Sequence, residues 1–159
     1  MNFKLILVGA LAWLVVTWAL GMGVTGPFLH EGVLREAYMA TGSFWRPELM
    51  SDPPDMAALM PRWLTIGVIG ALIVAGVYGL VRSSFTGPGW KRGLKYGFML
   101  FLLNAALLWG WSGVFNLPDT IWAWWCLEVL LMNLAGGLAI GWVADLKFVS
   151  GETPARAAA

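Results

Sequence analysis

The stretch Ile121–Val143 reads IWAWWCLEVLLMNLAGGLAIGWV and contains a single charged residue, Glu128. At a rise of 1.5 Å per residue, an α-helix of about 20 apolar residues crosses the roughly 30 Å hydrocarbon core of a bilayer. A backbone in lipid must satisfy its hydrogen bonds internally, so a helix is the expected structure. The stretch therefore predicts a transmembrane helix in an all-α membrane protein.

Three further apolar runs carry no charged residue: Leu5–Thr25, Trp63–Val81 and Tyr96–Phe115. The first is longer than the apolar region of a signal peptide, so we expect it to be retained. Only residues 116–120 separate the third and fourth runs, which predicts antiparallel neighbours. Together the four runs predict an antiparallel four-helix transmembrane bundle.

We expect this bundle to form one domain over residues 1–149, followed by a disordered tail at 150–159. The composition of 59% hydrophobic and 12% charged residues excludes a soluble globular domain, which has about 25% charged residues. The net charge of +1 gives no basic excess for nucleic acid. The expected partner is the lipid bilayer, with a homo-oligomer or a larger membrane complex as open alternatives.

The charges of two loops predict the orientation. Segment 82–95 holds four basic residues and no acidic one, whereas segment 26–61 holds five acidic and two basic residues. Short basic loops stay in the cytoplasm. We therefore expect a multi-pass protein of the bacterial inner membrane with both termini cytoplasmic and segment 26–61 outside.

Segment Leu29–Thr41 of the long loop has a helical apolar pattern. Its apolar residues fall on one helical face, with the charged pair Glu31 and Arg35 on another. This predicts a short amphipathic helix on the membrane surface or capping the bundle. The apolar face comprises Leu29, Val33, Leu34, Ala37 and Tyr38.

Small residues recur every four positions in two of the runs and predict close helix packing, because small side chains let backbones approach in lipid. Asn104 and Asn133 should lie at similar depth in their antiparallel helices, which favours a hydrogen bond between them. The two stripes comprise Gly67, Ala71, Ala75 and Gly79 in the second run, and Asn133, Gly137 and Gly141 in the fourth.

Glu128 is the only ionisable residue inside an apolar run and lies about 10 Å from the start of its helix. A charge near mid-membrane costs roughly 2.5–3.5 kcal/mol on insertion scales, so such residues are functional or paired. Proton handling, ligand binding, a structural pair with a loop residue and a subunit contact all remain open. The candidate ligand-binding residues are Glu128, His30, Arg46, Trp45 and Tyr38.

The tryptophans near the predicted outer ends of the helices have two interpretations. Amphipathic rings favour the membrane–water interface, which accounts for most of them. The alternative is an aromatic-lined pocket for an apolar ligand. The residues concerned are Trp63, Trp109, Trp111, Trp122, Trp124 and Trp125.

A set of short motifs resembles a group of small bacterial four-span membrane proteins of unknown function. The resemblance covers most of the chain outside the tail and implies the four-span fold, but no activity. The motifs are His30, Leu34, Tyr38 and Thr41 followed by Trp45-Arg46-Pro47-Glu48, the run Gly93-Leu94-Lys95-Tyr96-Gly97, Pro118 and a glycine-rich last run.

The sequence contains no GxSxG, HExxH or phosphate-binding loop motif. One histidine and one cysteine give no metal-ligand set, so no metal is expected, and the cofactor is unknown. The sequence favours a non-enzymatic accessory or interaction subunit. The alternative is a binding or transport protein for a small hydrophobic ligand or ion, with its site under the long loop. An enzyme using Glu128 with His30 or Arg46 has the least support.

Overall fold

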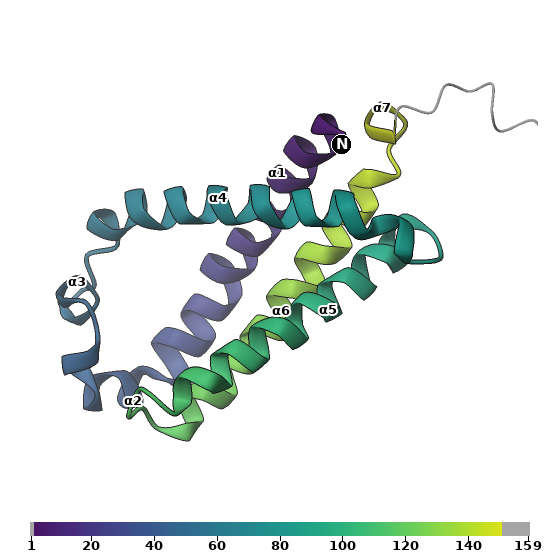
Figure 1. The fold of residues 1–159 in the computed structure, drawn as a ribbon. Helices are drawn as coiled ribbons and strands as arrows, with labels where there is room; N and C mark the ends of the chain where they lie inside the picture. The colour runs from purple at the N-terminus through teal and green to yellow at the C-terminus, as the bar shows by residue number, and fades with distance from the viewer. Residues whose placement is uncertain (1, 151–159) are drawn as a thin grey trace, which may run out of the picture.

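The structure is a computed structural model that describes residues 2–150 (Figure 1). Within this range, four helices are long and apolar enough to cross a membrane, which confirms the expected all-α four-helix fold. These are α1 with its continuation η1 (Phe3–Leu20, Gly21–Val33), α4 with η3 (Met56–Val81, Arg82–Ser84), α5 (Gly89–Ser112) and α6 (Asp119–Ala144). The short elements are α2 (Arg35–Ala40), η2 (Gly42–Phe44), α3 (Pro47–Met50) and α7 (Lys147–Ser150).

The first membrane helix is longer than the sequence predicts. It continues past Thr25 as the π-helix η1, so only α2 remains of the separate amphipathic helix expected over Leu29–Thr41. The hydrogen bonds of this segment span five residues. For example, the Leu34 N–H donates to the Leu29 carbonyl at 2.8 Å. The wide turns also direct Val33 outward, where it is 44% exposed instead of lying on the buried face.

Helices α5 and α6 are in backbone contact along a line of glycines. A Cβ placed on Gly93 would meet the carbonyl oxygen of Gly137, and one on Gly97 would meet that of Asn133. A Cβ on Gly141 would likewise meet Gly89. The small stripe of the fourth apolar run therefore packs against matching glycines of α5, because only hydrogen fits between the two backbones.

The small stripe of α4 faces α1. Ala71 and Ala75 are buried, and a Cβ placed on Gly67 would meet the side chains of Trp18 and Leu14 of α1. Further along, Gly79 lies next to Leu5. The stripe thus forms the α1–α4 contact, while α6 packs against both α1 and α5.

A polar contact joins α5 to α6 within the membrane-spanning region. Asn104 Nδ2 donates to Asn133 Oδ1 at 3.3 Å, the hydrogen bond expected from their depths. Asn133 is buried, and its Nδ2 donates to the Val129 carbonyl at 2.7 Å. The buried amide therefore has partners for both its donor and its acceptor, as a polar group in an apolar environment requires.

The two ends of the bundle differ. The N-terminus and α7 lie together at one end, where Asn2 Nδ2 donates to the Val149 carbonyl at 2.6 Å (Figure 1). The other end, which we call the loop end, carries α2 and α3. Toward the loop end α4 diverges from α1, and the α2–α3 segment bridges the two helices (Figure 1). The expected disordered tail lies outside the described residues, except for Ser150.

Candidate functional site

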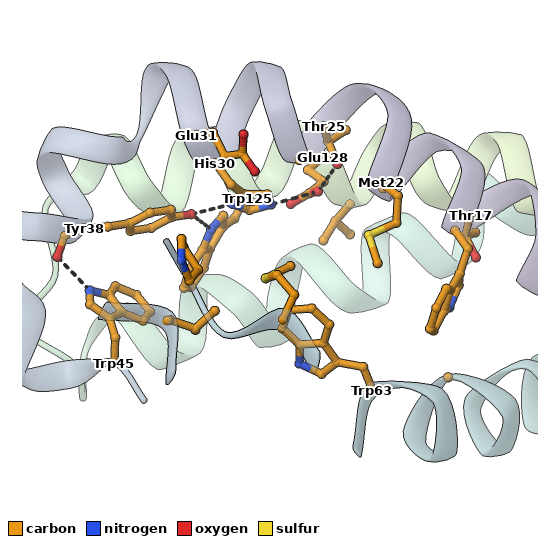
Figure 2. Close-up of a pocket in the computed structure, with 18 of the residues that line it drawn as sticks. Thr17, Met22, Thr25, His30, Glu31, Tyr38, Trp45, Trp63, Trp125 and Glu128 are labelled. Carbon is orange, nitrogen blue, oxygen red and sulfur yellow. Dashed lines mark hydrogen bonds and ion pairs between the residues drawn. The ribbon is translucent and has the colours of Figure 1, made fainter. Parts of the chain in front are cut away.

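A cavity of about 820 Å³ lies at the loop end. Its walls come from α1 and η1, the α2–α3 segment, α4, one residue of α5 and the first half of α6. Ligand pockets are usually concave, mostly apolar and about 300–1,000 Å³ in volume, so this cavity is large enough for a small molecule. The cavity is lined by α1 and α4, which diverge toward the loop end (Figure 1), and Figure 2 shows side chains that line it.

Glu128 of α6 lines this cavity and accepts two hydrogen bonds on one carboxylate oxygen. Thr25 Oγ1 donates to Glu128 Oε1 at 2.5 Å, and His30 Nε2 lies 3.2 Å from the same atom. The other oxygen, Oε2, has no hydrogen-bond partner among the described residues. The Glu128 side chain is 18% exposed and that of His30 is 37% exposed. The carboxylate is therefore held in place on one side and accessible on the other.

The π-helical turns of η1 explain how both partners reach the same carboxylate. Thr25 and His30 are five residues apart, which in an α-helix would place them about 140° from one another. In a helix whose hydrogen bonds span five residues, the two positions instead lie roughly one turn apart on the same face. The local backbone geometry thus builds the site.

A hydrogen-bonded chain continues from His30 toward the loop. His30 Nδ1 lies 2.8 Å from the Tyr38 hydroxyl, which accepts a hydrogen bond from Trp125 Nε1 at 2.8 Å (Figure 2). An indole N–H can only donate, so the tyrosine hydroxyl is free to donate its own proton to Nδ1. This assignment leaves the proton of a neutral imidazole on Nε2, where it points at Glu128.

Burial keeps Tyr38 protonated. Loss of solvent raises the pKa of Tyr38 to about 12, with a smaller opposing effect of the Trp125 hydrogen bond and a small further rise from the negative charge of Glu128. Because this pKa lies far above neutral pH, the hydroxyl remains a hydrogen-bond donor over the whole physiological pH range.

Three aromatic rings form one side of the cavity. Trp45 packs edge-on against Tyr38 and Trp125, with ring centroids 5.0 and 5.9 Å apart. The indole N–H of Trp45 donates to the Tyr38 carbonyl at 3.1 Å and to Thr41 Oγ1 at 2.9 Å. These bonds fix Trp45 although it lies in a loop between short helices. The rings pack together with the buried Leu29, Leu34 and Ile121.

Arg46 is the candidate that the structure places elsewhere. Its guanidinium donates to Glu48 Oε1 at 2.8 Å, and it does not line the cavity. This hydrogen bond lowers the pKa of Glu48. Arg46 is therefore engaged by a carboxylate two residues away in the loop and does not join Glu128. The other four candidates, Glu128, His30, Trp45 and Tyr38, all line the cavity.

Two residues of the site are not among the five candidate ligand-binding residues. Trp125 is one of the tryptophans with two interpretations, and its position three residues before Glu128 places both on one helical face. Thr25 ends the first predicted apolar run, and only the π-helical turns bring it to the carboxylate. Among the described residues, no group of three or more His, Cys, Asp or Glu side chains is placed to hold a metal ion.

The chain was compared with protein-family models, curated proteins and solved structures, and none of them matches it. The chemistry of the cavity therefore has to be inferred from its own residues.

Proposed function

We propose that this protein is a membrane-embedded binding protein whose cavity at the loop end holds a small amphiphilic molecule. One observation supports the proposal: the His30–Glu128 pair lies in the wall of a large, mainly apolar cavity. An apolar ligand body would lie along the walls, and a polar group would reach the carboxylate. This is the arrangement expected of small-molecule sites, in which a few polar groups fix orientation.

The unused oxygen of Glu128 supports binding over a purely structural role. A carboxylate that only joined α6 to η1 would be fully covered by its partners, since exposed charge in an apolar setting is costly. Here both hydrogen bonds from Thr25 and His30 end on Oε1, and Glu128 also lines the cavity. A ligand group at Oε2 would complete the coordination of the carboxylate.

We propose that the protein lies in a bacterial inner membrane with both termini in the cytoplasm. The four basic residues of segment 82–95 support this orientation, as does the negative charge of segment 26–61. The cavity would then open in the outer half of the bilayer. Membership of the four-span group that the sequence resembles, and the role of an accessory subunit, stay predictions. Ligand binding is compatible with both.

The test uses the full-length protein in phosphatidylcholine nanodiscs and tritiated dodecanol as a neutral amphiphilic probe. We expect saturable binding above that of empty nanodiscs. Met22→Trp adds bulk inside the cavity and should abolish this binding. The matched control is Val24→Trp, because Val24 is similarly exposed on the same helix but does not line the cavity. Equal binding by both variants, or no saturable binding to the wild type, would contradict the proposal.

A further inference from the structure

The cavity wall is predominantly acidic. Glu128 and Glu31 are its two carboxylates, and His30 is the one basic side chain among the described lining residues. Among the described residues that line the cavity there is no lysine or arginine. Two carboxylates outweigh one imidazole, so the cavity carries a net negative charge in either protonation state of His30. Net repulsion is therefore expected for a fatty-acid carboxylate or a lipid phosphate.

Aromatic rings in the cavity wall add to this preference. Tyr38, Trp45 and Trp125 lie together on the side of Glu128 nearest the loop, Met22 lies on the other side, and Trp63 lies across the cavity on α4 (Figure 2). The faces of aromatic rings attract cations, and indole does so best. Aromatic rings in the wall of an acidic cavity are typical of sites that bind an ammonium group.

We infer that the ligand of this cavity is a lipophilic cation, with an ammonium group at Glu128 Oε2 and an apolar body along the walls that include Met22 and Trp63. This rests on the proposed function, because it specifies the class of molecule that the same cavity binds. The attraction is strong because charge pairs are weakly screened away from water. No lysine or arginine in the cavity wall competes for the carboxylate.

The experiment compares three amphiphiles with the same alkyl chain as competitors of tritiated dodecanol in the same nanodiscs. They are dodecyltrimethylammonium, which is permanently cationic, unlabelled dodecanol, and dodecanesulfonate, which is anionic. We expect the cation to compete about tenfold or more better than dodecanol, the range of a hydrogen bond or contact with a charged group. The sulfonate should compete least.

Glu128→Gln keeps the size of the side chain and removes its charge. We expect it to reduce the advantage of the cation over dodecanol by about tenfold, with little change in the dodecanol affinity itself. Taking the ratio of the two affinities cancels differences in partition into the lipid. Glu31→Gln removes the second lining carboxylate and should also reduce the advantage of the cation, but by less. This variant leaves the His30–Glu128 pair intact, so it tests the charge of the cavity without disturbing that contact. Glu36→Gln is the matched control, because it removes the same charge outside the cavity.

The outcomes separate the inference from the proposed function. Equal competition by all three amphiphiles, or strongest competition by the sulfonate, would overturn the cationic class and leave a binding cavity. An unchanged cation advantage in both Glu128→Gln and Glu31→Gln would do the same. If tritiated dodecanol does not bind saturably to the wild type, the proposed function falls as well.

Discussion

The imidazole Nε2 of His30 lies 3.2 Å from the carboxylate Oε1 of Glu128, although 98 positions separate the two residues in the chain. The contact joins the end of the first membrane helix to the middle of the last. It also ties Glu128, the only acidic residue inside the four predicted apolar runs, to the only histidine of the sequence.

His30→Ala and Glu128→Leu should not act independently on stability. Each substitution removes the same hydrogen bond, so the double variant should lose less than the sum of the single losses. We expect a coupling free energy of about 1 kcal/mol, within the range of contacting pairs. The measurement is a double-mutant cycle on the free energy of unfolding in mixed micelles. Strict additivity would show that the contact contributes nothing to stability.

Asn133→Ala should destabilise the protein more than Asn104→Ala. Loss of Asn104 removes one interhelical hydrogen bond, for which about 0.6 kcal/mol is typical in membrane proteins. Loss of Asn133 removes that bond and the one to the Val129 carbonyl. The same unfolding assay measures both, with Asn116→Ala in the exposed loop as a control. The reverse order of the two effects would contradict the geometry.

Gly93→Ala should disrupt the contact between α5 and α6. A Cβ there would meet the Gly137 carbonyl oxygen, which is backbone and cannot move away cheaply. Overpacking of this kind costs about 1–3 kcal/mol and sometimes more. Gly110→Ala, in the same helix but with open space around its Cβ, should be neutral or slightly stabilising. Thermal unfolding of the two variants provides the comparison, and equal melting temperatures would count against the close backbone contact.

The phenol of Tyr38 should ionise at a higher pH than an ordinary tyrosine. Its pKa is raised to about 12 by burial, above the value of about 10 for a free phenol. The fold favours the neutral form, so its contribution to stability is full below pH 10 and is lost as the pH rises through about 12. The near-ultraviolet phenolate absorbance of the wild type minus that of Tyr38→Phe isolates this titration. A difference curve with its midpoint near pH 10 would mean that the ring is solvated.

Much of the fold follows from simple properties of the sequence. Depth counted along antiparallel helices places Asn104 opposite Asn133, and a four-residue spacing places Ala71 and Ala75 at a helix contact. Both inferences depend only on regular α-helical geometry and on the requirements of apolar surroundings. They succeed because these stretches are regular.

The site is less predictable because it depends on irregular backbone and on competition between partners. Regular periodicity separates Thr25 from His30, and only the π-helical turns of η1 bring them together. Arg46 has the charge needed to pair with Glu128, but it pairs with Glu48 in its own loop. The partner of the Gly137 stripe was also open, since the glycines at 89, 93 and 97 become a matching surface only once α5 and α6 are placed side by side.

The central position of α6 has a consequence for the order in which the protein is made. Ribosomal synthesis delivers α1 and α4 first, and these helices already share a contact through Gly67, Ala71 and Ala75. Helix α6, which packs against both α1 and α5, emerges after α1, α4 and α5. Its insertion brings Glu128 to Thr25 and His30. The part of the cavity wall that α6 supplies is therefore missing until this helix has been made.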